Sequence, residues 1–380
     1  MSGIVILGTG LAGYNLAREI RKRDKDVELI LITQDDGAFY SKPMLSNALA
    51  KKKLPDDLPM ADVEKMRADL NAAVMTDTTV TAIDADNKTL SLQNETINYD
   101  KLVLAVGASP IQLPIKGDAA DDIVVVNNLV DYREFRQRLE GKQSVAIIGP
   151  GLIGCEFAND LVQAGYRADV IGPDETPLGR LLPTQIGLAA QQALKEAGVN
   201  WHLQTVVDEV NRQPSGYQLS LQNGEQLQAD VVLSAIGLRA NKQLAESVGI
   251  KCNRGILVNR QLETSHADIY ALGDCAEVSG HFLPFVLPIM QCVRALAATL
   301  CGEPTDVSYP AMPVLVKTPS YPLIVSPPHR DAQGAWEITQ VGQGLKGLFM
   351  HEGNLLGMAL GGEAVSEKQA LSKQLPPVLQ

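Results

Sequence analysis

A ten-residue pattern occurs twice in this chain and restricts its fold more than any other feature. Residues 4–13 read IVILGTGLAG, and residues 145–154 read VAIIGPGLIG. Each copy is an apolar, strand-like run followed by G-x-G-x-x-G and a helix-like segment, at 14–23 in the first copy and at 155–164 in the second. The chain therefore repeats one strand–turn–helix unit.

The two copies also continue alike. After each helix come a second apolar strand, a meander of short β segments with polar turns, and a final buried strand. Strands that alternate with helices form a parallel sheet with helices on both faces. The sequence thus predicts an α/β protein with two doubly wound, Rossmann-like domains. The second strands, meanders and final strands are predicted at 27–33, 80–92 and 100–107 in the first copy and at 168–171, 217–227 and 230–237 in the second.

The glycines of each motif point to a dinucleotide. The first allows a tight turn, the second lets the backbone approach a pyrophosphate, and the third lets the helix pack closely on the strand. The N-terminus of the following helix then offers N–H donors to the phosphates. The predicted binding residues are Gly8, Gly10, Leu11, Ala12 and Gly13 in the first copy and Gly149, Gly151, Leu152, Ile153 and Gly154 in the second.

An acid about twenty residues after the glycines would bind the adenosine ribose. The first copy has Asp35 and Asp36 just beyond its second strand, whereas the second copy has Gly172 at the strand tip and acids only at Asp174 and Glu175. No Arg or Lys stands there to bind a 2′-phosphate. NADH is therefore expected in preference to NADPH.

Composition narrows the function classes further. The chain has 380 residues with 33 basic and 44 acidic side chains, a net charge of −11, so it lacks the basic excess of a nucleic-acid binder. No apolar run reaches the roughly 18 residues of a membrane span, and no basic leader precedes the first strand. We expect a cytoplasmic protein without a membrane span, acting as a monomer or homodimer.

Three further motifs carry a resemblance to a known family. Residues 264–274 read TSHADIYALGD, and the two final strands end in AVGA at 105–108 and SAIG at 234–237. With the two glycine motifs, they resemble the FAD-dependent pyridine nucleotide-disulfide oxidoreductases. We call the glycine motif at 8–13 the first cradle and the motif at 149–154 the second. The resemblance implies that FAD binds in the first cradle and NADH in the second. It also implies that Asp274 is hydrogen-bonded to the ribitol chain of FAD.

Within that family, the chain is most similar to the rubredoxin–NAD⁺ reductases. The matching stretches are YSKPMLS at 40–46, GLIGCEFAND at 151–160 and MPVLVKTP at 312–319. The resemblance implies that Lys42 is the cation beside the flavin and that Glu156 pairs with Lys42 near the site of hydride transfer. Lys317 would contact the flavin from the C-terminal domain.

The five cysteines decide between mechanisms, because none forms a C-x-x-C or C-x₄-C pair. Disulfide reductases of this architecture relay electrons through such a dithiol. Cys155 and Cys275 are expected to pack as small buried residues, and no metal site is predicted. Electrons must then leave the flavin directly. The resemblance implies that they pass one at a time to rubredoxin or a similar small iron–sulfur protein.

Several alternatives stay open. A reductase of ferredoxin or flavorubredoxin would use the same chemistry. A flavin-bearing signalling protein similar to apoptosis-inducing factors and an oxidase that reduces O₂ belong to other classes. The run 51–53 of three lysines is either a docking patch for an acidic partner or a solvated loop, and the solvated loop is the preferred interpretation.

The motifs also predict the domain layout. A discontinuous FAD-binding domain covers 1–112 and 241–311, an NAD(H)-binding domain covers 113–240, and a small α+β domain covers 312–380. In the last domain, 336–341 and 347–360 are predicted strands and 364–373 a helix. The predicted catalytic residues are Lys42 and Glu156, and the cofactor-binding residues outside the glycine turns are Thr33, Asp35, Val80, Ala105, Gly107, Gly237, Gly273, Asp274, Val286 and Lys317.

Overall fold

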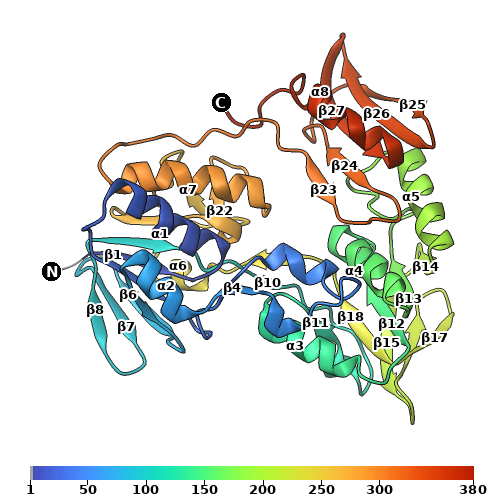
Figure 1. The fold of residues 1–380 in the computed structure, drawn as a ribbon, viewed down its shortest axis with the longest axis horizontal. Helices are drawn as coiled ribbons and strands as arrows, with labels where there is room; N and C mark the ends of the chain where they lie inside the picture. Colours follow the sequence, from blue (N-terminus) through green and yellow to red (C-terminus); the bar gives the residue numbers. More distant parts are fainter. Residues whose placement is uncertain (1–2) are drawn as a thin grey trace.

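The first glycine-rich turn follows the central strand of a five-stranded parallel sheet (Figure 1). This computed structural model describes residues 3–380. The strand order is β21–β9–β1–β2–β5, and all neighbouring strands run parallel. The strands are β1 (Ile4–Leu7), β2 (Leu29–Ile32), β5 (Ala73–Met75), β9 (Lys101–Leu104) and β21 (Ile269–Ala271).

The second turn takes the same place in a second parallel sheet, whose order is β11–β18–β12–β13–β14. Strands β12, β13, β14 and β18 stand where β1, β2, β5 and β9 stand in the first sheet. The predicted repeat of two Rossmann-like units is therefore confirmed. The strands are β11 (Val124–Val125), β12 (Ser144–Ile148), β13 (Arg167–Gly172), β14 (Val199–Leu203) and β18 (Val231–Ser234).

Helices α1 and α4 each begin directly after a glycine-rich turn and pack on the sheet of that turn. Helix α1 buries Leu16, Ala17 and Ile20, which share one face, and it lies beside α7 (Figure 1). Within residues 3–380 no helix is long and apolar enough to cross a membrane. The helices are α1 (Leu11–Arg23), α2 (Val63–Leu70), α3 (Leu129–Arg138), α4 (Leu152–Gln163), α5 (Thr184–Glu196), α6 (Gln243–Glu246) and α7 (Val286–Leu300).

The first half of the molecule is built on the first parallel sheet and the second half on the second. The two halves contact each other at two places that bear on the site. Strand β10 (Ala108–Pro110), after β9, pairs antiparallel with β19 (Leu238–Ala240), after β18. Between β3 (Phe39–Tyr40) and β4 (Pro59–Ala61), which pair with each other, the chain makes an excursion from the first half. Its apolar side chains pack in one cluster with Leu161 of α4. This excursion contains the 3₁₀ helices η1 (Lys42–Asn47) and η2 (Pro55–Asp57).

Each half also carries an antiparallel meander, as predicted, but both have three strands and extend beyond the predicted 80–92 and 217–227, because β8 follows the first range and β15 precedes the second. The second meander turns at Asn223-Gly224, where Gly224 has a φ of +88°, a left-handed conformation that favours glycine. The meander strands are β6 (Val80–Asp84), β7 (Thr89–Leu92), β8 (Thr96–Asn98), β15 (Val207–Arg212), β16 (Tyr217–Leu221) and β17 (Gln226–Ala229). The remaining short elements are η3 (Ala120–Asp122), β20 (Ile256–Val258), η4 (Gly273–Cys275) and β22 (Ala276–Val278).

A third, antiparallel sheet of order β23–β24–β27–β26–β25 forms the C-terminal part. Its Val316, Leu323 and Ala359 pack against Ile186 and Ala190 of α5, so this sheet lies on the second half (Figure 1). The fold class predicted from the sequence is confirmed, including the small C-terminal α+β unit. The strands are β23 (Val314–Val316), β24 (Leu323–Ser326), β25 (Ala335–Val341), β26 (Gly344–His351) and β27 (Asn354–Gly361).

Two predictions for this part need correction. The segment 347–360 belongs to two strands, because Glu352 and Gly353 have φ of +48° and +80° and turn the chain into a hairpin. The predicted helix at 364–373 is wrong in its first half: a 3₁₀ helix, η5 (Gly362–Glu367), precedes the short α8 (Lys368–Ser372).

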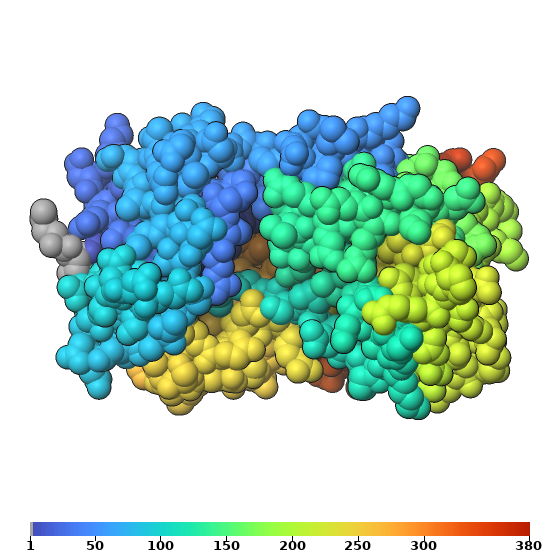
Figure 2. Space-filling view, turned by 90° about the horizontal axis from the view of Figure 1, so that it is seen from below, coloured from blue at the N-terminus to red at the C-terminus, as the bar shows by residue number. Residues whose placement is uncertain are grey.

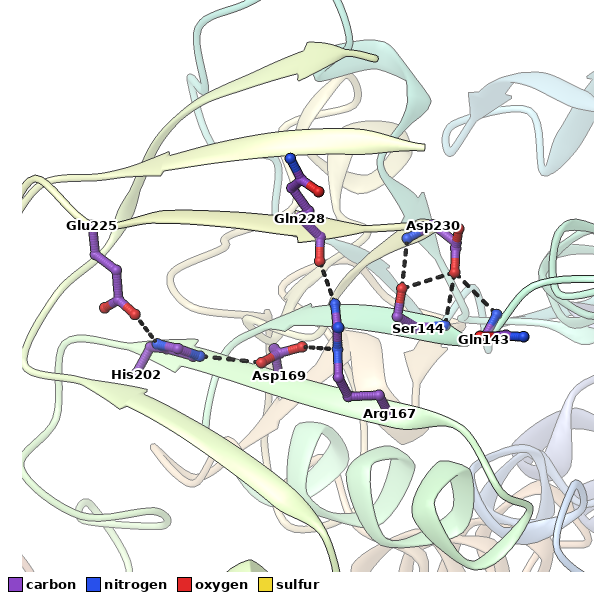
Figure 3. Close-up of polar contacts among 8 residues, drawn as sticks. All are labelled: Gln143, Ser144, Arg167, Asp169, His202, Glu225, Gln228 and Asp230. Atoms are coloured by element: carbon purple, nitrogen blue, oxygen red, sulfur yellow. Dashed lines mark hydrogen bonds and ion pairs between the residues drawn. The ribbon is translucent and has the colours of Figure 1, made fainter. Parts of the chain in front are cut away.

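A polar cluster fastens the second meander to the second sheet (Figure 3). His202 on β14 lies 3.2 Å from the Oδ1 of Asp169 on β13 and, through its other ring nitrogen, 2.9 Å from the Oε1 of Glu225 in the meander. Arg167 bonds both Asp169 and the carbonyl of Gln228 on β17. The hydrogen bond with Asp169, above all, raises the pKa of His202, while that bond lowers the pKa of Asp169 against the effect of burial.

This cluster predicts a pH-dependent stability. The folded pKa of His202 lies above its ordinary value of 6.5, so its contribution is complete below pH 6.5 and is lost as the pH rises through the folded pKa. We expect the free energy of unfolding to fall by up to about 1 kcal/mol across this range. Denaturant titrations of the wild type and of His202→Gln measure the effect, which His202→Gln should lack. His329→Gln, at an exposed ion pair, should retain it.

Candidate active site

The two glycine turns have matching geometry. Gly8 and Gly149 have φ of +113° and +114°, and a Cβ on either would overlap or crowd the backbone of the neighbouring strand's end, at Ala105 and Ala235. By contrast, a Cβ built on Gly10 or Gly151 meets no atom within 4 Å. The second glycine of each turn thus leaves open space, as the approach of a pyrophosphate requires.

The third glycines serve packing, as expected. A Cβ on Gly13 or Gly154 would overlap the carbonyl oxygen of the first glycine of its own turn. The helices α1 and α4 therefore start directly against their strands, with Gly10 and Gly151 as N-caps and no side chain bonded to the free N–H groups. Leu11, Ala12, Leu152 and Ile153 form these first turns. Both cradles fit a dinucleotide.

The ribose positions of the two cradles differ. Asp35 lies exposed beyond β2, and its Oδ1 accepts hydrogen bonds from the Thr33 hydroxyl at 2.7 Å and the Gly37 N–H at 3.0 Å. In the second half, a Cβ on Gly172 would overlap the ring of Pro150. The strand tip is therefore restricted to glycine by the proline of the turn, which explains why no acid stands there.

Of the other predicted FAD-side residues, Gly273 has a direct contact with the first cradle. A Cβ on Gly273 would lie 2.9 Å from the Cβ of Ala12, so η4 touches the first turn of α1. Ala105 and Gly107 follow β9, and Val286 begins α7 with 39% of its surface exposed. Val80 begins β6 in the meander. Gly237 holds the place of Gly107 in the second half, and both have positive φ, +111° and +66°.

Lys42, the first residue of η1, lies between the two halves. Its Nζ donates to the Oδ1 of Asn127 at 2.6 Å and lies 4.0 Å from the Oδ2 of Asp274. Asn127 in turn donates to the carbonyl of Ala108. Burial lowers the pKa of Lys42, and the charge of Asp274 opposes this; burial raises the pKa of Asp274, which Lys42 opposes.

Glu156 lies in a second polar cluster, fully buried on α4. One carboxylate oxygen accepts from the Ser46 hydroxyl at 2.5 Å and lies 2.6 Å from the Nζ of Lys317. The other accepts the backbone N–H of Lys317 at 2.9 Å. The Nζ of Lys317 also donates to the Pro43 carbonyl and, at 2.8 Å, to Ser46. Three parts of the chain thus meet at one carboxylate.

The predicted pair of Lys42 with Glu156 is wrong. The lysine that reaches Glu156 is Lys317, and Lys42 bonds Asn127 and Asp274 instead. Sequence reasoning also missed Ser46 and Asn127. Ser46 lies within the 40–46 stretch that carried the family resemblance, so a signal existed. Asn127 precedes the capping box of Asn128 and Asp131, which predicts a helix start and says nothing of Asn127 itself.

None of the five cysteines is in a disulfide bond. Cys155 and Cys275 are fully buried, and burial raises the pKa of both, that of Cys275 to about 12. Burial likewise raises the pKa of Cys292 to about 11. Thiols in this state are poor nucleophiles. Within residues 3–380 no group of acids, histidines and cysteines could hold a metal ion.

The space between the halves is open at the surface. Figure 2 shows a recess between the first half, in blue and cyan, and the α3 region of the second half, in green. Atoms in the orange range of the scale, which covers α7, lie at its floor. The run 51–53 lies on the excursion, where Lys51 and Lys52 are exposed.

Comparison with known proteins agrees with this geometry. The chain is 48% identical over 381 residues to a rubredoxin-NAD(+) reductase of Alcanivorax borkumensis, with both chains fully covered. It is 48% identical over 389 residues to a protein of the same name from Acinetobacter baylyi, covering 100% of this chain and 99% of the relative. The solved NADH:rubredoxin oxidoreductase of Clostridium acetobutylicum matches 98% of this chain and 94% of its own, at 25% identity and a TM-score of 0.82.

Two family descriptions divide the chain between them. Residues 306–375 match the rubredoxin binding C-terminal domain, which includes Lys317 and the third sheet. Residues 2–298, which contain both cradles, match the pyridine nucleotide-disulphide oxidoreductases. With two dinucleotide cradles in repeated Rossmann-like units, this chain belongs to the pyridine nucleotide-disulphide oxidoreductase family.

Proposed function

We propose that this protein is an NADH-dependent flavoprotein reductase that delivers electrons to rubredoxin one at a time. One observation carries the proposal furthest. Lys317, in the segment that matches a rubredoxin binding domain, reaches the buried Glu156 just one turn from the second cradle. The module that would bind the acceptor is therefore part of the site itself. A reductase in an electron-transfer chain such as alkane hydroxylation fits this arrangement.

The cofactors are FAD and NADH. When bound, they supply hydride transfer from the nicotinamide to the flavin and single-electron release from the flavin. We assign FAD to 1–112 and 241–311, NAD(H) to 113–240, and the acceptor-binding role to 312–380. The open glycines Gly10 and Gly151 admit the two pyrophosphates, and Asp35 would bind the ribose in the first cradle.

The charged residues organise the site. Lys42 would hold positive charge on the flavin side, with Asn127 and Asp274 fixing its ammonium group. Glu156 holds Ser46 and Lys317 together, and so keeps the C-terminal unit in contact with both halves. The five cysteines form no C-x-x-C or C-x₄-C pair that would relay electrons from the flavin, so we propose direct transfer from the flavin to the iron centre of the acceptor. We further propose that the protein works in the cytoplasm, where NADH is available.

Acceptor turnover tests this function. The purified protein is titrated anaerobically with NADH and mixed with oxidised rubredoxin in a stopped-flow instrument. We expect the flavin absorbance to bleach with NADH and to return on mixing, with rubredoxin reduced at least about 10-fold faster than ferredoxin. Flavorubredoxin and O₂ are the other acceptors tested.

The competing functions predict other outcomes. A reductase of ferredoxin or flavorubredoxin would prefer those acceptors, and an oxidase would consume O₂ rapidly. A flavin-based signalling protein would reduce every acceptor slowly and keep a long-lived complex with the nicotinamide. Any of these results would replace the proposed acceptor.

A further inference from the structure

Asp160 is a second buried acid on α4, one turn beyond Glu156, and the site described above makes no use of it. Only 4% of its surface is exposed. Its Oδ2 accepts the N–H of Leu49 at 3.0 Å, and its Oδ1 accepts the N–H of Ala50 at 3.0 Å. Burial raises the pKa of Asp160, and these two hydrogen bonds oppose that rise. Both carboxylate oxygens are thus committed to the backbone of the excursion.

The backbone that Asp160 holds follows directly on η1. Within η1, the Ser46 hydroxyl donates to Glu156 and accepts from the Nζ of Lys317, and the Pro43 carbonyl accepts from the same ammonium group. If residues 49–50 shifted relative to α4, η1 would shift with them. Lys317 would then lose two of its partners, and Ser46 would move away from Glu156.

Helix geometry makes this coupling direct. Residues four apart share one face of a helix, so Glu156 and Asp160 point to the same neighbour. Asn159 lies beside them, nearly fully buried, and its Oδ1 accepts the N–H of Ser320 at 3.1 Å. One face of α4 therefore binds the excursion from the first half and the loop after β23 with consecutive turns of helix.

We propose that Asp160 is a positioning residue of the electron-transfer site. Its carboxylate fixes residues 49–50 to α4 and so holds Ser46 and Lys317 at Glu156. The inference rests on the proposed function, because it concerns the geometry of that same site. It extends the function to a residue that touches neither cofactor cradle.

The chain offers a matched control for a test. Asp230 also accepts the N–H groups of two successive residues, Gln143 at 3.0 Å and Ser144 at 2.9 Å (Figure 3). Asp230 directly precedes β18 and binds the first residue of β12, at the end of the second sheet opposite the glycine turn. Asp160→Ala and Asp230→Ala therefore remove the same kind of carboxylate from the same half of the molecule.

Stopped-flow reduction of bound FAD by NADH and amide hydrogen exchange are measured on both flavin-loaded variants. We expect Asp160→Ala to slow flavin reduction by at least about 10-fold and Asp230→Ala by less than about 2-fold. The amides of Leu49 and Ala50 should lose protection only in Asp160→Ala. Asp160→Asn, which keeps one acceptor oxygen, should be intermediate, and it carries the test if the alanine variant does not fold.

Two results would overturn the inference: equal slowing in Asp160→Ala and Asp230→Ala, or a wild-type rate together with unprotected amides at 49–50. Failure of the wild type to reduce rubredoxin would instead count against the proposed function. The amide exchange of 49–50 and the rate of flavin bleaching by NADH do not depend on the acceptor, so the two failures are distinguishable.

Discussion

Glu156→Gln is expected to slow the reduction of bound FAD by NADH by about 10- to 100-fold, while the protein keeps its flavin. The substitution preserves the shape of the side chain but removes its negative charge. The wild-type carboxylate lies 2.6 Å from the Nζ of Lys317 and accepts a hydrogen bond from the Ser46 hydroxyl. The largely buried Lys317 ammonium group then has no carboxylate partner. Its positive charge is left uncompensated in the site where NADH reduces the flavin. Stopped-flow absorbance of the flavin measures the rate, and the visible spectrum measures flavin content.

Stability provides a second measurement at the same position. Removing one partner from a buried ion pair costs about 3 kcal/mol, so Glu156→Ala should lower the free energy of unfolding by that order. Glu134→Ala is the control, because Glu134 pairs with Arg138 on the exposed surface of α3 at 2.7 Å. That variant should lose no more than about 0.5 kcal/mol and keep the wild-type rate. A wild-type rate in folded Glu156→Gln would exclude Glu156 from the site.

The two cradles were predictable because their requirements are local. A tight turn with φ near +114° selects glycine at Gly8 and Gly149 whatever the rest of the chain does. At Gly13 and Gly154, the atom that an added Cβ would meet first is likewise local, the carbonyl oxygen of the first glycine of the same turn. The spacing of the glycines is therefore enough to predict each turn, and because the same spacing occurs twice, it predicts two copies of the unit.

The partner of Glu156 was not predictable in this way. The glycine spacing places Glu156 near the start of α4. It does not tell whether Lys42 or Lys317, both from distant segments, is the partner of this carboxylate. Lys317 reaches it because the loop after β23 also donates a backbone N–H to the same carboxylate. Lys42 instead starts η1, where Asn127 from the segment before α3 accepts its ammonium group. Tertiary contacts between three parts of the chain decide the pairing.

The lack of a ribose-binding acid at the second cradle was only partly predictable from the sequence. Gly172 departs from the usual pattern, and the reason, the ring of Pro150, is visible in the sequence as a proline inside the turn. The sequence shows both residues, but their contact requires β12 and β13 to be neighbours. Once the sheet order is known, the departure follows from packing.

Gly10→Ala and Gly151→Ala are expected to separate the two cofactors. An added Cβ at either position meets no protein atom within 4 Å, and neither glycine has a positive φ, so both variants should fold. The methyl group takes only the space that a pyrophosphate needs. We expect Gly10→Ala to be purified with little or no FAD. Gly151→Ala should stay yellow and show a KM for NADH raised by at least about 10-fold.

Each variant is the control of the other, because the same atom is added at the same place in each repeat. Flavin content is read from the visible spectrum after denaturation, and the KM from NADH-dependent rubredoxin reduction. The reverse result, a colourless Gly151→Ala and a yellow Gly10→Ala, would exchange the assignment of the two halves. Equal loss of flavin in both would mean that the open space at these glycines is needed for folding. The pair of variants therefore tests the assignment of FAD to the first cradle and of NADH to the second, one cradle at a time.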